Sequence, residues 1–368
     1  MRVKLEDVCE RGTSSLMQKD IVDKNGKYPV YGASGRIGSM ETYQQEHQTV
    51  AVVKDGAGIG RTMLLPEKSS IIGTMQYLIP KNCIEPEYLY YAVKYMHLEK
   101  YFSGATIPHI YFRDYKTEEF NLHNKTEQQE IISTLKRVEA VISNRREQLA
   151  MLDELVKARF VEMFGDPISH PFGFKVKTLQ KMIDDGTIMY HLDGNHGSDY
   201  PRNEEFVECG VPYISANCIV HNDVNLKLAK HLTEERASKL RKGIAQNGDV
   251  LFAHNATVGP VAILYTDDEK VILGTSLTAY RCDKERMVPD YLKAYMQSEG
   301  FVCQYTKDMK QTTRNQVPIT AQRKFLFVIP PLSLQNQFAA FAAEVDKSKL
   351  FAELFAQNAC ILAENRSK

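Results

Sequence analysis

The sequence predicts an α+β fold in which two α/β globular halves, arranged as a pseudo-two-fold tandem, are separated by two long antiparallel coiled-coil helices. Two observations predict it. Apolar residues recur at alternating spacings of four and three in residues 126–164 and again in 333–362. Short turn and strand motifs of the first half return in the same order about 200 positions later. The spacing is typical of helices that pair along an apolar seam, and the repeat indicates a duplicated unit.

Composition narrows the class of protein. A chain of 368 residues, 43% hydrophobic and 25% charged, is ordinary for a globular protein of two or three domains. It has no run of 18 apolar residues, so we expect no membrane span. The seven cysteines are scattered without a C-x-x-C pair. This pattern favours reduced thiols in the cytoplasm over a disulfide framework or a zinc site.

Net charge gives no indication of a partner. Lys and Arg together number 46, and Asp and Glu also number 46. A protein that binds nucleic acid usually carries a basic excess on one face. Any such face must therefore come from the arrangement of charges and not from their balance.

The first long helix is predicted over residues 126–164. At 1.5 Å per residue, about 39 residues form a rod of roughly 58 Å, too long to bury its seam in one small domain. Thr126 with Gln129 forms a predicted capping box at its start, and Gly165 precedes a proline stop. Arg145 and Arg159 interrupt the seam. Its apolar residues are Ile131, Leu135, Val138, Ile142, Leu149, Leu152, Val156 and Met163.

The second long helix is predicted at the C-terminal end, with Ser333 as its cap after two prolines. It repeats the same four–three spacing with a polar break at Ser348. Two long stripes favour an antiparallel helix pair over two separate core helices. The larger seam residues are Leu334, Phe338, Phe341, Val345 and Phe355.

The globular halves are predicted to consist of short strands and turns. A buried strand over 49–53 precedes a glycine turn and a second strand over 62–65. A helix is expected from Pro86 to about Tyr101, and a strand over 120–122 leads into the long helix.

The repeat keeps its order while its offset grows from 199 to 207 positions, as small insertions would cause. The paired segments are 52–60 with 251–259, 71–74 with 272–275, 85–89 with 288–292, and Gln128 with Gln335.

The ordered motifs resemble those of the specificity subunits of type I restriction–modification systems. The resemblance is carried by four segments: Lys4–Val8, Tyr28–Gly35, Lys54–Ala57 and Ile329–Gln335. It implies a first target recognition domain over 1–124, a central spacer helix over 125–164, a second recognition domain over 165–332 and a C-terminal spacer helix over 333–368.

The resemblance also implies a function. A subunit of this family does no chemistry; it reads a bipartite, asymmetric target in double-stranded DNA and docks two methyltransferase subunits on its helices. A motor–nuclease subunit can join the complex. This chain is then expected to need no cofactor of its own, with S-adenosylmethionine, ATP and magnesium held by partner subunits, and it is expected to contact no membrane.

Candidate DNA contacts are side chains with directional donors and acceptors in glycine-rich turns and polar loops. In the first half they are Tyr28, Tyr31, Ser34, Arg36, Lys54, Arg61, Thr106, His109 and Arg113. In the second half they are His254, Asn255, Lys310, Gln311, Thr312, Thr313, Arg314, Asn315 and Gln316. The segment around Arg314 occupies the position equivalent to 103–113.

Other interpretations stay open. The chain could serve a related restriction system with a fused methylase–nuclease, or be a coiled-coil scaffold that does not contact DNA. A nucleotide-dependent methyltransferase could use the Gly56–Gly60 loop, but Arg61 stands where a dinucleotide motif needs glycine, and a strand follows instead of a helix. His191 and His196 flank Asp193 in a polar loop, and we expect no metal there.

Overall fold

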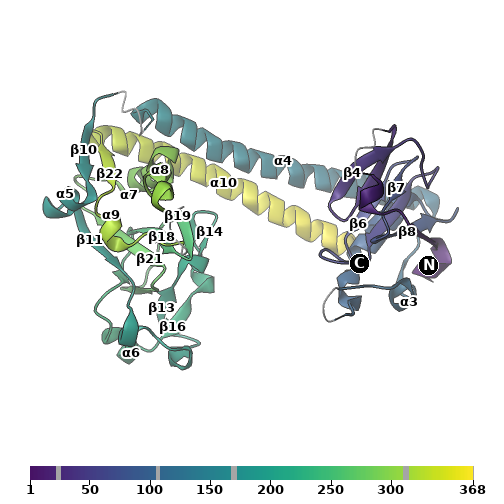
Figure 1. Cartoon of the computed structure of the whole chain (residues 1–368), viewed down its shortest axis with the longest axis horizontal. Coiled ribbons are helices and arrows are strands. Elements are labelled where there is room, and N and C mark those ends of the chain that lie inside the picture. The colour runs from purple at the N-terminus through teal and green to yellow at the C-terminus, as the bar shows by residue number, and fades with distance from the viewer. Residues whose placement is uncertain (22–25, 105–107, 167–171, 310–314, 368) are drawn as a thin grey trace. The chain divides into compact units, whose positions relative to one another are not determined.

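The fold is given by a computed structural model that describes residues 1–21, 26–104, 108–166, 172–309 and 315–367; the side chains of 198, 307–309 and 351–367 lie outside the description. The chain divides into two compact units (Figure 1). Unit 1 comprises Met1–Arg146 and Glu353–Lys368, and unit 2 comprises Glu147–Ala352. Each unit holds both helices and sheets, as the sequence predicts.

Unit 1 contains a four-stranded antiparallel sheet in the order β2-β8-β5-β6 and a smaller sheet in the order β4-β3-β7, in which β3 and β7 run parallel. A third pair joins β1 to β9. The strands are β1 (Arg2–Lys4), β2 (Cys9–Thr13), β3 (Tyr28–Gly32), β4 (Gly35–Met40), β5 (Thr49–Val53), β6 (Thr62–Leu65), β7 (Ser70–Ile71), β8 (Met75–Pro80) and β9 (Glu119–Asn121). The helices are α1 (Leu5–Val8), α2 (Pro86–Tyr95), α3 (Phe112–Tyr115) and the 3₁₀ turns η1 (Gln18–Asp20) and η2 (Leu98–Tyr101).

Strand β5 forms the centre of unit 1, and all five of its residues are buried. It lies between β8 and β6, so both of its edges are paired. Val50 and Val52 pack into the cluster that contains α2, and Ala51 and Val53 pack into a second cluster on the other face. Burial of both faces explains the continuous apolar sequence. Leu89 and Val93 on α2 are fully buried against one face of this sheet. The apolar stripe of α2 therefore closes the core of unit 1.

Unit 2 repeats the four-stranded sheet in the order β11-β21-β18-β19 and enlarges the second sheet to β12-β16-β13-β20-β17, where β13 and β20 run parallel. The strands are β10 (Lys175–Thr178), β11 (Ile188–Asp193), β12 (Phe206–Val207), β13 (Val211–Ile214), β14 (Ile219–Val220), β15 (Asp223–Val224), β16 (Lys230–Leu232), β17 (Ile244–Ala245), β18 (Val250–Asn255), β19 (Thr257–Ile263), β20 (Val271–Leu273), β21 (Leu277–Cys282) and β22 (Leu326–Ile329). The helices are α5 (Leu179–Asp184), α6 (Glu234–Ser238), α7 (Pro289–Gln297), α8 (Glu299–Met309), α9 (Ile319–Gln322) and the 3₁₀ turns η3 (Gly197–Asp199), η4 (Asn203–Glu205), η5 (Ala216–Cys218) and η6 (Leu226–Leu228).

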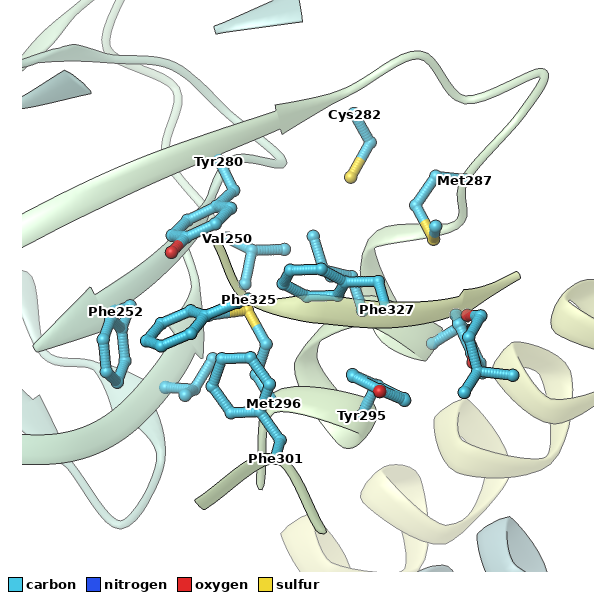
Figure 2. Close-up of a cluster of buried hydrophobic side chains, with 14 of the residues drawn as sticks. Val250, Phe252, Tyr280, Cys282, Met287, Tyr295, Met296, Phe301, Phe325 and Phe327 are labelled. Atoms are coloured by element: carbon cyan, nitrogen blue, oxygen red, sulfur yellow. Dashed lines mark hydrogen bonds between the residues drawn. The ribbon is translucent and has the colours of Figure 1, made fainter. Parts of the chain in front are cut away.

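Aromatic side chains dominate the core of unit 2 (Figure 2). The Phe301 ring lies 5.1 Å from Phe325 and 5.5 Å from Phe327, and edge-on to Phe252 at 6.2 Å. These centroid distances are those at which edge-to-face and offset ring pairs are stable. The cluster packs α8 and β22 against β18 of the four-stranded sheet.

The duplication seen in the sequence is also present in the structure. The two four-stranded sheets have the same order, and each unit has one parallel strand pair beside it. Gln128 accepts a hydrogen bond from the Glu85 amide at 2.8 Å, where α2 begins, and Gln335 does the same for the Val288 amide at 2.9 Å, where α7 begins. Both glutamines are fully buried. The same side chain thus joins each long helix to its unit.

The long helices are α4 (Lys125–Phe164) and α10 (Leu332–Ser367). The predicted seam of α4 is its least exposed side: every seam residue is half-buried, whereas Val141, Met151, Leu155 and Val161 are 45–60% exposed. On α10, Phe338 and Val345 are buried. Phe355 lies outside the residues whose side chains are described.

Within unit 2 the two helices contact each other, and the Arg159 guanidinium, one of the two predicted seam interruptions, lies 5.8 Å over the Phe341 ring. The Phe160 and Phe338 rings lie 5.6 Å apart, and Lys349 pairs with Asp153 at 2.7 Å. The contact at the higher residue number on α10, Lys349, is with the lower residue number on α4, Asp153. The helices therefore run antiparallel in this unit, as the sequence predicts.

The expected cap of α4 is wrong by two residues. The helix begins at Lys125, and the reciprocal hydrogen bonds join Asn124 to Glu127 at 3.0 and 3.1 Å. Thr126 and Gln129 lie inside the first turn. Asparagine is a better N-cap than threonine, and here it occupies the one position before the first helical residue.

Two other predicted boundaries differ from the structure. Helix α10 begins at Leu332, so Ser333 lies in the first turn and does not cap it. Helix α2 ends at Tyr95 because His97 adopts a left-handed conformation with φ of 52°, and a 3₁₀ turn completes the stretch to Tyr101. Local propensity does not reveal such a break.

Among the described residues, no helix is both long and apolar enough to cross a membrane. The cysteines in this part of the chain, which include Cys83, Cys209 and Cys303 at the surface, are free thiols.

The buried glutamine joint generates a prediction. Gln128→Leu leaves the Glu85 amide and the Cys83 and His123 carbonyls without their partner, and we expect unit 1 to lose about 1–3 kcal/mol of unfolding free energy. Urea unfolding followed by circular dichroism measures the shift. Gln129→Leu is the matched control, since Gln129 is exposed on the same turn. Equal shifts for both variants would contradict the joint.

Candidate nucleic-acid interface

The turn after β5 is held to the loop over residues 103–110. Ile110 donates its amide to the Lys54 carbonyl at 2.9 Å. The next residue, Asp55, forms a β-bridge with His109, and its carboxylate lies 2.7 Å from the His109 Nδ1. Lys54, Asp55 and His109 are each about one-third exposed. Two predicted contact regions, 54 positions apart at Asp55 and His109, are thus one surface.

An aromatic stack extends this surface outward. The Tyr111 ring stacks on His109 with 6.3 Å between centroids and 23° between planes, and the Arg113 guanidinium lies 4.7 Å over Tyr111. The Arg113 side chain is 76% exposed. The ring limits where the guanidinium can lie while leaving its donors accessible. Tyr111 was not among the predicted residues, although its spacing from Arg113 could have suggested it.

A third predicted region joins this surface through Arg61, whose Nη1 donates to the Ala33 carbonyl at 2.8 Å. Ser34, Arg36 and Arg61 are exposed, while Tyr28 and Tyr31 are half-buried. The β3–β4 turn and the glycine turn therefore lie side by side. Thr106 lies outside the described residues.

The glycine turn between β5 and β6 has a conformational explanation. Gly56, Gly58 and Gly60 have φ values of 87°, 97° and 80°, which side chains rarely adopt. A Cβ at Gly60 would also lie 2.6 Å from the Glu99 amide nitrogen. A strand follows, not a helix, so the loop is a turn and not the phosphate site of a methyltransferase.

Unit 2 places an equivalent surface at the end of β18. Val317 donates its amide to the His254 carbonyl at 2.8 Å, just as Ile110 donates to Lys54. Asn255 bridges Gln316, and the Asn315 carbonyl accepts from the Ala256 amide at 3.0 Å. The predicted equivalence of the two loops holds at this point. Lys310, Gln311, Thr312, Thr313 and Arg314 lie outside the described residues.

His254 does not lie on this surface. Its residue is 1% exposed, and its Nδ1 is 3.1 Å from the Val317 carbonyl. Burial lowers the pKa of its imidazole. The strand register and the shared hydrogen bond match His254 to Lys54, which corrects the sequence pairing of 52–60 with 251–259 by one position. Lys54 is partly exposed because β5 ends at Val53, whereas β18 continues through His254 and keeps that side chain inside the sheet. The His254 side chain is therefore not accessible to DNA, contrary to the sequence prediction.

A buried polar network that sequence reasoning missed lies beneath this loop. Gln322 is fully buried and accepts hydrogen bonds from the Tyr280 hydroxyl at 2.7 Å and the His191 Nε2 at 3.1 Å. It donates to the Thr278 hydroxyl and the Val317 carbonyl, both at 3.1 Å. These residues are up to 131 positions apart, so no local pattern could have revealed them.

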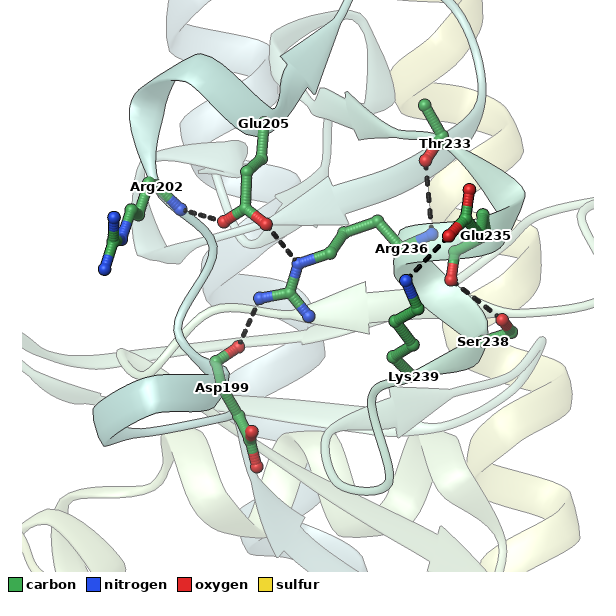
Figure 3. A network of polar contacts seen from close by, with 8 residues as sticks. All are labelled: Asp199, Arg202, Glu205, Thr233, Glu235, Arg236, Ser238 and Lys239. Atoms are coloured by element: carbon green, nitrogen blue, oxygen red, sulfur yellow. Dashed lines mark hydrogen bonds and ion pairs between the residues drawn. The ribbon is translucent and has the colours of Figure 1, made fainter.

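A second network holds a segment of unit 2 between η3 and α6 (Figure 3). The Arg236 Nε donates to the Glu205 carboxylate at 2.6 Å, and its Nη2 donates to the Asp199 carbonyl at 3.1 Å. The Arg202 amide donates to the same carboxylate at 2.7 Å and, with Arg236, lowers the pKa of Glu205. The network fixes a segment that leaves the Arg202 residue exposed.

The histidines weighed as metal ligands have other partners. His196 pairs with Asp193 at 2.8 Å, and His191 is buried against Gln322. No group of three potential ligands occurs in the part of the chain that the structure describes.

Unit 1 also contains a cavity of about 730 Å³ between α2, β9 and the first turns of α4. Tyr88, Tyr91 and Tyr95 line it from α2, and Ile131 and Leu135 from α4. None of its lining residues is among the predicted DNA contacts.

Comparison with protein families gives one match. Residues 1–152 match the type I restriction modification DNA specificity domain. A search of curated proteins gives no match.

Solved structures resemble the whole chain. A type I restriction–modification S subunit from M. genitalium is 15% identical with a TM-score of 0.60. A chain from a structure of complex assembly and conformational transition in the type I R-M system is 14% identical with a TM-score of 0.51. Each comparison covers 99% of this chain and 94% of the other. At this identity the likeness shows the fold.

The pairing of Asp55 with His109 generates a prediction. Asp55→Asn removes the charge that holds the loop, and a partly exposed pair contributes about 0.2–1 kcal/mol. We expect amide exchange at Ser103 and Ile110 to accelerate by up to about fivefold, a factor that corresponds to 1 kcal/mol. Hydrogen exchange with mass spectrometry measures it. Asp114→Asn is the control, since Asp114 contacts the adjacent Arg113 and not the strand; acceleration in both variants would contradict the prediction.

Proposed function

We infer that this chain, whose first 152 residues belong to the type I restriction modification DNA specificity domain family and whose whole length has the fold of an S subunit, is the non-catalytic specificity subunit of a type I complex. It reads a bipartite, asymmetric target in double-stranded DNA. One observation carries the proposal: the same surface, a strand end bridged to a polar loop, occurs once in each unit. Two readers of one scaffold call for two half-sites.

The two surfaces carry different chemistry. In unit 1 the exposed Arg113 suits guanine, whose O6 and N7 can both accept from one guanidinium. In unit 2 Asn255, Asn315 and Gln316 suit adenine, which offers one donor and one acceptor to an amide side chain. The half-sites should therefore differ in sequence, which makes the target asymmetric.

The long helices act as the spacer between the recognition domains. Their antiparallel contacts in unit 2 and the single 40-residue span of α4 support this role. A continuous helix transmits a fixed distance because its rise per residue is constant. The spacing of the half-sites is then set by the helices and not by the loops that read bases.

The helices also dock methyltransferase subunits. At about 100° per residue, the exposed Met151 and Leu155 in unit 2 fall within an arc of roughly 40°, about a third of a turn from the seam. Exposed apolar stripes on one face mark protein interfaces. Two such partners carry the chemistry, with S-adenosylmethionine in the methyltransferases and ATP and magnesium in a motor–nuclease subunit where one joins.

The target prediction is tested by co-expressing the chain with its methyltransferase and sequencing the methylated genome of the host. We expect methyladenine in one two-part sequence with a fixed gap and different halves. The same methyltransferase without this chain is the control. Methylation confined to continuous palindromes would contradict two-domain reading, and unchanged methylation without the chain would contradict a specificity role.

The docking surface gives a separate prediction. Met151→Glu with Leu155→Glu places two charges in the proposed interface, and we expect copurification of the methyltransferase to fall at least about tenfold, as a cost above 1.4 kcal/mol implies. Val161→Glu is the matched control, since Val161 is 52% exposed on α4 but lies outside the arc. Retained copurification by the double variant would remove this face from the interface.

A further inference from the structure

The backbone of Val317 is held on both sides. Its amide donates to the His254 carbonyl at 2.8 Å. Its carbonyl accepts two hydrogen bonds, from the His254 Nδ1 and from the Gln322 Nε2, both at 3.1 Å. Val317 directly follows Asn315 and Gln316, the described end of the loop that bridges Asn255. These three hydrogen bonds form a clamp on Val317, which fixes the backbone next to Asn315 and Gln316.

The hydrogen bonds determine the protonation of the network. A carbonyl can only accept, so the Gln322 Nε2 must face Val317 and its Oε1 must face His191 and Tyr280. His191 then donates through Nε2 and His254 through Nδ1. Their other ring nitrogens are buried without partners, and burial lowers the pKa of His191 to about 4. Both histidines are neutral single donors at pH 7.

The scaffold does not need this network, because unit 1 folds without it. Leu78 pairs with Val50 where Tyr280 pairs with Val250, so Leu78 takes the place of Tyr280. In the same strand register Lys54 occupies the position of His254. Arg11, opposite Leu78, stands for His191, opposite Tyr280. By the offset of 207 that relates Gln128 to Gln335, Tyr115 stands for Gln322.

Burying polar groups costs desolvation unless they are hydrogen-bonded. In unit 1, Gln76 takes the place of Thr278, and the Gln76 Nε2 and the Tyr115 hydroxyl are buried without partners, so the connected network is particular to unit 2. Two duplicated units whose four-stranded sheets have the same strand order need no such difference for folding. The difference lies directly under the loop in which their surfaces also differ. The network is therefore best explained by what the loop of unit 2 must do.

We propose that His254 and Gln322 are positioning residues that determine the specificity of unit 2 by holding Val317, and with it Asn315 and Gln316, in the orientation that reads base edges. The proposal rests on the proposed function. Hydrogen bonds to bases are directional, whereas phosphate contacts carry no sequence information. Loosening the clamp should lower discrimination at one half-site while overall attachment to DNA remains.

The test uses the complete complex with its methyltransferase and the two-part target found by methylome sequencing. Binding is measured to the target and to duplexes with one base changed in either half. His254→Leu removes the donor to Val317, and we expect discrimination at one half-site to fall about tenfold, within the range that one mismatched pair contributes. Discrimination at the other half-site stays unchanged and is the internal control.

Two further variants separate positioning from folding. His254→Asn keeps an N–H at the place of Nδ1 and should restore discrimination, which a purely steric role would not allow. Thr278→Val is isosteric and removes one partner of the Gln322 amide, so it gives a smaller loss at the same half-site. It keeps the test decisive if His254→Leu does not yield folded protein.

Three results would overturn the proposal. The first is unchanged discrimination in both His254→Leu and Thr278→Val. The second is an equal loss at both half-sites together with a lower unfolding temperature, which would mark a structural role only. The third is failure of His254→Asn to restore discrimination. Failure of the unaltered complex to discriminate at either half-site would instead overturn the proposed function, so the two failures are distinguishable.

Discussion

The joint between each long helix and its globular unit is the constraint on which the rest of the structure depends. For a rod of about 60 Å, a swivel of 10° at one end moves the other end by roughly 10 Å, so the joint determines the direction of the whole helix. Gln128 and Gln335 prevent this swivel because each is fully buried and bonded both to a carbonyl five residues earlier and to the amide of the residue just before the neighbouring helix. A surface contact could not hold that angle, since water would replace it at little cost.

With the joints conserved between units, the loops are free to differ. The four-stranded sheets keep one order, while the second sheet grows from three strands in unit 1 to five in unit 2. The added segment needs its own support, which Arg236 supplies through Glu205 and the Asp199 carbonyl. Under the proposed function, recognition can therefore change in one unit without altering the helices that act as the spacer.

The sequence predicted what depends on periodicity and on turn chemistry. Spacing and turn residues predicted the seam of α4, the strand over 49–53 and the equivalence of Gln128 with Gln335. The structure agrees with each of these three predictions. The sequence could not predict the burial of His254, because that depends on whether the strand ends one residue earlier or later. Nor could it predict the network around Gln322, whose partners come from β11, β21 and the loop before α9.

The absence of a net charge gives the clamped loop its importance. With 46 basic and 46 acidic residues, the chain has no overall excess of positive charge, which in basic proteins supplies most non-specific binding to phosphates. Its affinity must then depend more on contacts that require correct orientation. An amide side chain gives its two base hydrogen bonds only within a narrow range of angles. Under the proposed function, a neutral side chain such as Asn315 thus needs a rigid backbone beneath it more than Arg113 does, because the charge of Arg113 tolerates displacement. Unit 2 is the unit in which a buried network holds that backbone.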